Sequence, residues 1–365
     1  MNFRRSTFAF AFLSATALSL AATAADVPAG YPADYAKVIE AAEKEGKVVV
    51  YSSTDAAAAQ PLLKAFAKAF PKITVEYNDL NSTELYNRLI SEVAAGSTGD
   101  VTWSTAMDLQ IKLAQDGYAM TYASPEKAKL PSWAAYKDQA YGTTYEPILF
   151  VHNKRLLPEA QMPKTHDEFI KILTEKKAEL TNKVATYDPE RSGTGFAYIS
   201  NDQLHFPKLW DLAAALGGVS VKLYTSTGTM LEKIGSGEHV LGYNMIGSYA
   251  INRGKKDPNV GVVYPQDYME VVSRVMMIPA KAKNPNAAKV FLNFVLSLDG
   301  QKAMADSGLF AMRDDVEGEA TAKSLKAKFG DKLKPIPVDD TTTQYLDQTK
   351  RLAFLKKWQE AVSKH

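Results

Sequence analysis

Short apolar runs alternate with amphipathic stretches along the chain from residue 47 onward. The apolar runs are continuous, which is typical of parallel strands buried on both faces, and they cover residues 47–51, 73–77 and 100–104. The stretches between them have apolar residues at helical spacing, and they predict a helix that begins at Pro61 and helices over residues 85–94 and 108–115. Asn81, with Glu84 three positions later, forms a capping pattern ahead of the second helix. Three strand–helix units in succession predict a doubly wound α/β domain.

A second set of the same kind follows a break near residue 145. Residues 145–153 (YEPILFVHN) form an extended apolar run, and Thr165, followed by Glu168, is a capping pattern that predicts the next helix. Further strands are predicted over residues 183–187, 240–243, 261–264 and 270–278. Further helices are predicted from Gly193 and Gly247 and over residues 210–216, 285–296, 300–305 and 346–362. The order of the elements therefore predicts two α/β lobes.

The N-terminus has a different pattern. Arg4 and Arg5 precede an apolar run from Phe8 to Leu20, which is followed by Ala22-Thr23-Ala24. A basic start, a short apolar segment and small residues at a cleavage site are typical of a secretory signal peptide, here residues 1–25. The apolar run is too short to span a bilayer once its flanks are excluded. The mature protein is therefore expected to work outside the cytoplasm, where ATP and NAD are scarce.

Charge and composition narrow the range of partners. The 365 residues include 43 basic and 41 acidic residues, and two of the basic ones, Arg4 and Arg5, belong to the predicted signal peptide. The remainder is formally neutral and has no long basic run, which argues against nucleic acid or an anionic membrane as partner. The chain has no cysteine, so it has no disulfide and no thiolate metal site. The five histidines have no paired spacing, and no cofactor is predicted.

Three motifs, in order, resemble those of the periplasmic solute-binding proteins of ABC importers. Residues 145–156 (YEPILFVHNKRL) with 163–169 (PKTHDEF) are similar to an "apolar strand, then Asn-Lys, then Pro-Lys-Thr-x-x-Glu" passage of that family. Residues 291–313 (FLNFVLSLDGQKAMADSGLFAMR) resemble its "F-x-x-F-x-x-S-x-x-G-Q" segment and the Gly and Arg that follow. Residues 48–53 and 79–83 (DLNST) are similar to the openings of the ferric-ion and organophosphonate branch.

The resemblance implies a type II fold with two α/β lobes, crossing strands between them and a cleft that closes on the ligand by hinge bending. The first lobe would comprise residues 26–145 plus 275–365, and the second residues 146–274. The crossings would be the strand near residues 146–153 and either 261–264 or 270–278. The resemblance also implies a monomeric periplasmic protein without enzymatic activity. It would deliver a small anion to an inner-membrane ABC permease or present it to a sensor kinase.

The ligand is expected beyond the carboxyl ends of the strands, where helices begin. The side chains predicted there are mostly hydroxyls, amides and tyrosines: Ser52, Ser53, Thr54, Asn81, Thr105, Tyr145, Asn244, Ser248 and Tyr249. The strongest motif is Arg191-Ser192-Gly193-Thr194, which resembles the anion-binding turn of the family. Hydroxyls, N–H groups and an Arg suit phosphate, phosphonate, sulfonate or carboxylate. The simpler alternative is a Ser N-cap followed by turn glycines.

Two other functions are weighed against the organic anion. The ferric branch implies a His, a Glu and two adjacent Tyr; here Asp55 and Tyr249 remain as candidate iron ligands, and Thr105 stands near the Glu position. Fe³⁺ needs several hard donors, so the residues favour an organic anion, whose amino group, if present, would pair with Asp55 and Glu146. A hydrolase is least favoured, because no Gly-x-Ser-x-Gly or His-Glu-x-x-His motif is found.

Overall fold

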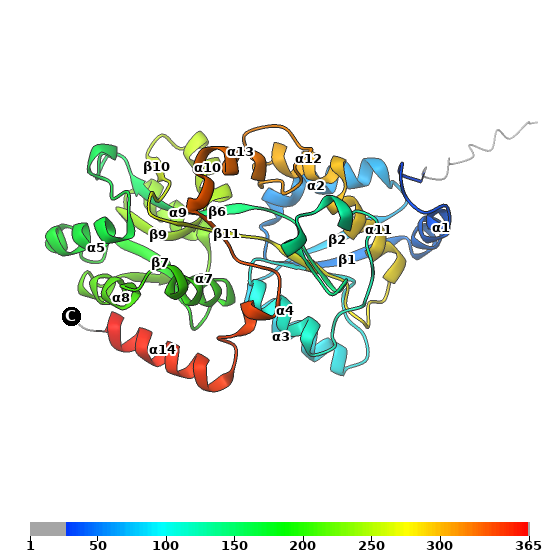
Figure 1. The fold of residues 1–365 in the computed structure, drawn as a ribbon, viewed down its shortest axis with the longest axis horizontal. Helices are drawn as coiled ribbons and strands as arrows, with labels where there is room; N and C mark the ends of the chain where they lie inside the picture. The colour runs from blue at the N-terminus through cyan, green and yellow to red at the C-terminus, as the bar shows by residue number, and fades with distance from the viewer. Residues whose placement is uncertain (1–26, 364–365) are drawn as a thin grey trace, which may run out of the picture.

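The computed structural model describes residues 27–363, and the predicted signal peptide lies outside the described residues. Within this range the chain forms two mixed sheets, each flanked by helices, in two lobes that lie side by side (Figure 1). The predicted α/β fold with two lobes and crossing strands is confirmed. None of the helices between residues 27 and 363 is long and apolar enough to cross a membrane.

The first sheet contains three parallel strands and then antiparallel ones. Its strands, in spatial order, are β2 (Thr74–Asp79), β1 (Lys47–Ser52), β3 (Val101–Ser104), β12 (Val275–Met277), β5 (Ala140–Gly142) and β4 (Ala135–Tyr136). β1 is parallel to β2 and β3, whereas β12 is antiparallel to β3 and β5. Val48 and Val50 of β1 are fully buried in the core of this lobe, which explains the continuous apolar run in the sequence.

The second sheet repeats this arrangement. Its strands, in spatial order, are β13 (Leu333–Pro335), β11 (Met269–Val272), β6 (Glu146–Asn153), β9 (Leu241–Ile246), β7 (Val184–Tyr187) and β8 (Lys222–Tyr224), with β10 (Val260–Val263) also paired to β6. β7 is parallel to β8 and β9, and β6 is antiparallel to β9. Each lobe therefore has three parallel strands beside an antiparallel strand that arrives from the other lobe.

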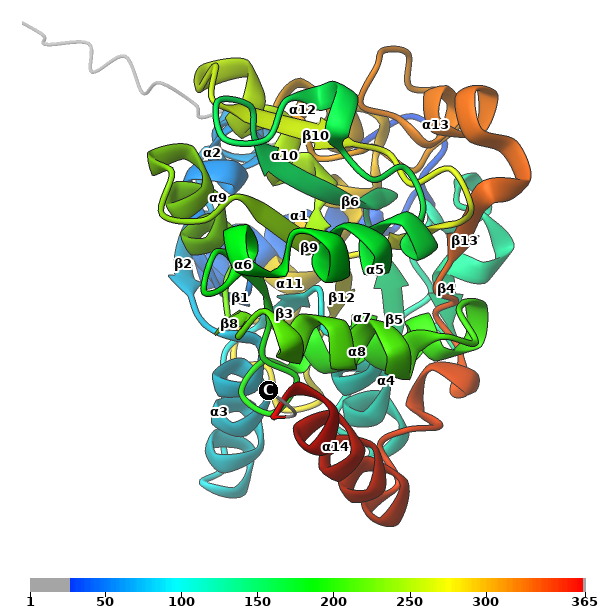
Figure 2. The same ribbon diagram turned by 90° about the vertical axis from the view of Figure 1, so that its left-hand side faces the viewer.

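The helices lie mostly on the faces of the two sheets (Figures 1 and 2). In chain order the α-helices are α1 (Tyr35–Glu45), α2 (Ala56–Ala69), α3 (Ser82–Ala94), α4 (Met107–Gln115), α5 (His166–Glu175), α6 (Lys177–Leu180), α7 (Gly193–His205), α8 (Leu209–Gly218), α9 (Thr227–Ser236), α10 (Gly247–Lys256), α11 (Pro285–Leu296), α12 (Leu298–Asp306), α13 (Ala322–Phe329) and α14 (Gln348–Val362). Short 3-10 turns cover Lys127–Lys129, Ser132–Ala134, Glu159–Gln161, Gly330–Lys332 and Asp340–Thr343.

Two helix starts test the sequence prediction, and only that of α2 differs from it. α2 begins at Ala56 rather than at Pro61, which lies inside the helix. The alanine run ahead of Pro61 has a high helix propensity, so the helix extends toward the N-terminus despite the backbone bond that proline cannot make. At α5 the predicted cap is confirmed, because Thr165 Oγ1 accepts the N–H of Glu168 at 3.1 Å.

Two of the chain's three passages between the sheets lie next to each other, and the third runs from β12 through α11, α12 and α13 to β13. One crossing lies between β5 and β6, at residues 143–145, and the other lies between β11 and β12, at Ser273 and Arg274. The N–H of Thr143 donates to Arg274 O at 3.0 Å, so the two crossings are bonded to each other. The strand expected over residues 270–278 is thus two strands, because the chain leaves one sheet and enters the other. β10, the alternative crossing, lies in the second sheet only.

The lobe boundaries drawn from the sequence remain a prediction, but the last part of the chain does not lie with the first sheet. β13 pairs with β11, and α14 packs on α8 of the second lobe. Phe354 of α14 contributes apolar surface there, with its ring 5.2 Å from that of Trp210. Figure 1 shows α14 beneath the second lobe. Residues 333–362 are therefore best grouped with the second lobe.

Candidate ligand-binding cleft

A cleft of about 210 Å³ lies between the two lobes. All six parallel strands end at it, since its lining includes a residue at or just after the end of β1, β2, β3, β7, β8 and β9. The lining residues are Ser53, Asp55, Asp79, Leu80, Asn81, Ser82, Thr105, Tyr187, Thr194, Thr225, Ser226, Thr227, Ile246 and Tyr249. Both lobes thus present the carboxyl ends of their strands, and the helices that start there, to the same space.

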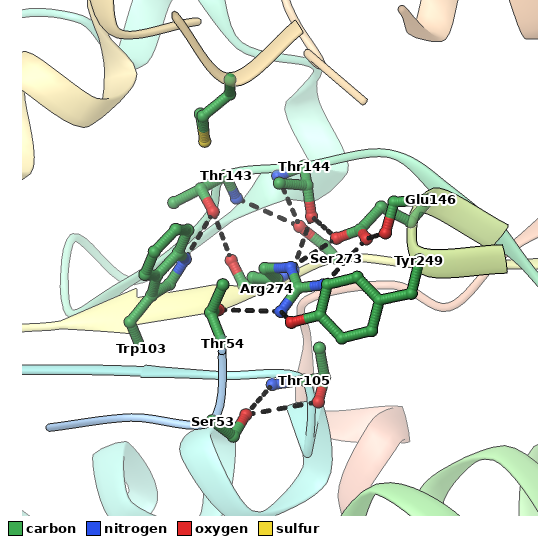
Figure 3. A network of polar contacts seen from close by, with 12 residues as sticks. Ser53, Thr54, Trp103, Thr105, Thr143, Thr144, Glu146, Tyr249, Ser273 and Arg274 are labelled. Atoms are coloured by element: carbon green, nitrogen blue, oxygen red, sulfur yellow. Dashed lines mark hydrogen bonds and ion pairs between the residues drawn. The ribbon is translucent and has the colours of Figure 1, made fainter. Parts of the chain in front are cut away.

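The wall from the first lobe is built on hydroxyl pairs. Ser53 follows β1 and Thr105 follows β3, and the N–H of Thr105 donates to Ser53 Oγ at 3.1 Å (Figure 3). Their hydroxyl oxygens lie 3.3 Å apart. Asn81 caps α3, because its Oδ1 accepts the N–H of Thr83 at 2.9 Å. The sequence correctly predicted that Ser53, Asn81 and Thr105 lie together at the strand ends.

Two carboxylates stand on the same wall. Asp79 Oδ2 accepts the N–H of Ala56, the first residue of α2, at 2.9 Å. The carboxylate of Asp55 is partly buried, and its Oδ2 faces Gly228 in the first turn of α9. Burial, and then the charge of Asp79, raise the pKa of the Asp55 carboxyl, while Arg274 lowers it. None of the lining residues is Lys or Arg, so the two carboxylates have no basic partner on the cleft surface.

The wall from the second lobe is neutral. Tyr187 Oη and Thr227 Oγ1 are hydrogen-bonded at 2.5 Å, which fixes the end of β7 against the start of α9. Ser226 caps α9, and Thr194 adds a hydroxyl from the first turn of α7. Burial raises the pKa of Tyr187, so its phenol stays protonated at neutral pH and can donate or accept a hydrogen bond.

On one side of the cleft the lobes touch directly. The N–H of Thr194 donates to Ser82 Oγ at 3.2 Å, the N–H of Gly193 donates to Thr83 Oγ1 at 3.0 Å, and the hydroxyls of Thr105 and Thr194 lie 2.8 Å apart. The starts of α3 and α7 therefore face each other. The N–H groups that the sequence suggested for an anion are here bonded to side chains of α3.

A fully bonded network lies behind the cleft, at the crossings (Figure 3). Arg274 and Glu146 are both fully buried and form a two-pronged ion pair, with Nε–Oε1 at 2.7 Å and Nη2–Oε2 at 2.9 Å. Nη1 of Arg274 donates to Thr54 Oγ1 at 2.7 Å and to Tyr249 Oη at 3.3 Å. Tyr249 Oη also accepts the N–H of Asp55 at 3.0 Å, which joins the lobes above the network.

The predicted site residues fall into two groups. Ser53, Asn81, Thr105, Thr194 and Tyr249 line the cleft. The others lie elsewhere: Ser52, Thr54, Ser192, Gly193 and Ser248 are held behind the wall by protein partners, Tyr145 packs against Trp133, Arg191 is exposed, and Asn244 bonds to Asp202. Glu146, the expected partner of an amino group, is occupied by Arg274.

The sequence prediction missed part of the second wall. Thr225, Ser226 and Thr227 follow β8, whose three residues form too short an apolar run to be recognised. The sequence does contain a pattern that predicts this wall. The run Thr-Ser-Thr-Gly-Thr over residues 225–229 includes a helix cap like those that follow the other strands. Asp79 and Leu80, at the end of β2, were also missed.

The cleft offers few ligands for a metal. Asp55, Asp79 and Tyr249 are its oxygen donors with acidic character, and the phenol of Tyr249 already accepts two N–H groups. Burial raises the pKa of Tyr249 to about 12, which keeps it protonated at neutral pH. Within residues 27–363, no group of three or more His, Asp or Glu side chains is arranged to hold a metal ion.

Comparisons with known proteins agree with this architecture. Residues 61–330 match the family model described as bacterial extracellular solute-binding protein. The structure is similar to the substrate-binding protein of an ABC transporter from Agrobacterium tumefaciens, with 40% identity, a TM-score of 0.84, and coverage of 87% of this chain and 94% of that one. A search of the curated proteins found no match.

More distant structures share the fold. The periplasmic binding protein AfuA from Actinobacillus pleuropneumoniae, with exogenous fructose-6-phosphate bound, has 19% identity, a TM-score of 0.72, and coverage of 87% and 99% of the two chains. Iron-bound HitA from Pseudomonas aeruginosa has 20% identity, a TM-score of 0.62, and coverage of 74% and 88%. The family predicted from the sequence motifs is confirmed.

Proposed function

The chain belongs to the family of bacterial extracellular solute-binding proteins, and we propose that it captures a small organic anion, such as a phosphonate or a phosphate ester, in the cleft between its lobes. It would do so in the periplasm and deliver the anion to an inner-membrane ABC permease. In this role the protein binds and releases the solute without converting it.

The observation that carries this proposal is the meeting of six strand ends and the helices that follow them at one cleft. First-turn N–H groups and the helix dipole favour negative charge at a helix start. In the second wall, Thr225, Ser226 and Thr227 at the start of α9 line the cleft with hydroxyls that can donate to an anion, and Asp55 Oδ2 faces the next residue, Gly228. These features support an anionic group on the second-lobe side.

The crossings support closure by hinge bending. Two short segments join the sheets, at residues 143–145 and at Ser273 and Arg274, and each is a break between two strands, while the third connection runs through the helices between β12 and β13. Rotation at these breaks can separate the walls while leaving each sheet intact. The bonds between the starts of α3 and α7 would then form on closure and break on release.

A ferric ion is the second candidate. It is favoured by the oxygen donors Asp55, Asp79 and Tyr249 on one cleft, and by the likeness in fold to iron-bound HitA. It is disfavoured by the protonated phenol of Tyr249 and by the lack of a third carboxylate or a His. Presentation of the ligand to a sensor kinase instead of a permease is compatible with the same cleft.

Thermal melting of the mature protein, refolded to remove any bound solute, tests the proposal. The panel contains phosphonates, phosphate esters, sulfonates, dicarboxylates and ferric citrate. A ligand at a hundred times its Kd stabilises the folded protein by about 2.7 kcal/mol, which raises Tm by several degrees. A rise with one class of organic anion supports the proposal, and a rise with ferric citrate alone would replace it by iron binding.

A further inference from the structure

We infer that the ligand carries a positively charged group as well as an anionic one, and that Asp55 and Asp79 select it. This inference rests on the proposed function, since it concerns the same cleft. It names the class of ligand as small zwitterions, in which an ammonium group and an acid group lie a few bonds apart.

The two carboxylates stand side by side at the first-lobe wall. Asp79 is the last residue of β2 and Asp55 follows β1, the neighbouring parallel strand, and both line the cleft. Asp79 has one oxygen bonded to the start of α2, which leaves the other oxygen available. Asp55 Oδ2 points toward the opposite wall, because it would lie 3.4 Å from a Cβ placed on Gly228 in the first turn of α9.

Among the described residues, no Lys or Arg forms an ion pair with these carboxylates, although Arg274 lowers the pKa of Asp55 from behind the wall. The nearest buried cation, Arg274, lies behind Tyr249 and gives two hydrogen bonds to Glu146, which has its own compensating charge. No Lys or Arg is among the lining residues. An anion alone would therefore add negative charge to a cleft that already has two carboxylates, and its repulsion would be felt most from Asp55, which is partly buried, and less from Asp79, which is exposed to water.

A cationic group on the ligand resolves this imbalance. An ammonium group between Asp55 and Asp79 would receive two charge-assisted hydrogen bonds, while the acid group faces the hydroxyls at the start of α9. A sugar hydroxyl could also donate to the carboxylates, but it would leave their charge uncompensated. The cleft volume of about 210 Å³ suits a small metabolite, since drug-sized ligands occupy pockets of roughly 300 Å³ or more.

Matched ligand pairs test the inference by calorimetric titration of the refolded mature protein. The pairs are 2-aminoethylphosphonate and ethylphosphonate, γ-aminobutyrate and butyrate, and glucosamine 6-phosphate and glucose 6-phosphate. We expect at least one aminated member to bind, and its amine-free partner to bind at least thirtyfold more weakly. Equal binding of the two members, or preference for the amine-free member, overturns the inference and leaves the proposed function standing. Binding of ferric citrate alone overturns both.

Two variants assign the selection to the carboxylates. Asp55→Asn and Asp79→Asn keep the size of the side chain and remove its charge. Each should lower the affinity for the aminated ligand at least tenfold. The affinity for the amine-free ligand should stay the same or increase. The matched control is Asp211→Asn, an exposed carboxylate in the first turn of α8, which should keep the wild-type affinity. A Tm equal to that of the wild type, measured without ligand, would show that each variant folds normally. Unchanged affinity in both Asp55→Asn and Asp79→Asn contradicts the inference.

Discussion

The crossings and the cleft are neighbouring regions built from the same kinds of side chain, but their polar groups are used differently. At the crossings the carboxylate of Glu146 receives bonds from Arg274, Thr144 and Ser248. In the cleft, Asp55 shares a wall with hydroxyls and has no such set of partners among the described residues. The two regions differ because Arg274 pairs with Glu146 at the crossings and does not line the cleft.

This difference indicates which polar groups serve the fold and which serve the ligand. A buried ion pair that satisfies all its bonds gives the crossings one geometry, and breaking it leaves a charge without a partner. A carboxylate that faces a cavity is instead available to bind a group of the ligand. Substitutions at the crossings should therefore change stability first, and substitutions in the cleft should change affinity first.

The largest effect is expected at the crossings. Glu146→Ala leaves the Arg274 guanidinium buried without its counter-ion, and we expect it to lower the free energy of unfolding by about 3–5 kcal/mol. Urea denaturation measures this loss. The exposed pair Lys233–Glu238 supplies the control, since Glu238→Ala should leave stability within error. A loss at Glu146 as small as that of the control would contradict the role given to the network.

A third carboxylate is buried, and the effect of its burial on its pKa outweighs the opposing charge of Arg351. Asp108, near the start of α4, is buried, and burial raises its pKa to about 7; its Oδ2 has no hydrogen-bond partner among residues 27–363. Between pH 4 and 7 the folded state holds a proton that the unfolded state has lost, so stability falls as pH rises through this window and levels off above it.

Asp108→Asn should remove most of the decrease in stability between pH 4 and 7. The variant should therefore gain stability relative to the wild type as pH rises, by at most roughly 4 kcal/mol above pH 7, and differ little at pH 4. Melting curves of both proteins across this pH range check the prediction. Parallel curves would show that Asp108 does not titrate in the window.

Substitutions in the cleft wall should change affinity more than stability. Thr194→Val removes a hydroxyl that lines the cleft and bonds to Thr105, and we expect at least a tenfold loss of affinity, or roughly 1.4 kcal/mol, for the solute identified in the melting panel. Calorimetric titration of the single variant is decisive, and wild-type affinity would remove Thr194 from the site.

The smallest effect is expected from a substitution of Ser192, two residues before Thr194. Ser192 Oγ accepts the N–H of Gly195 at 3.1 Å, so Ser192→Ala removes a helix cap and should lower stability by about 1 kcal/mol. Affinity should not change, because the Ser192 side chain lies behind the wall. A loss of affinity without a loss of stability would restore the anion-binding role that the sequence motif suggested.

Much of the fold could be predicted from the sequence because local patterns determine it. Continuous valine runs predicted β1, and the residues after predicted strands led to Ser53 and Thr105. The site was predicted less well, since the ion pair of Glu146 and Arg274 joins residues 128 positions apart, which no local pattern encodes. Tyr145 lies in the crossing between β5 and β6, where its ring packs against Trp133 and is not among the residues that line the cleft.

The central claim is that the cleft between the lobes is where the solute binds. Thr225 lines the cleft without capping a helix, so Thr225→Trp should fill much of the cavity. The control is Thr174→Trp, on the exposed face of α5. Calorimetric titration with the organic anion that stabilises the wild type should give wild-type affinity in the control and no binding in Thr225→Trp. Wild-type affinity in Thr225→Trp would contradict the claim.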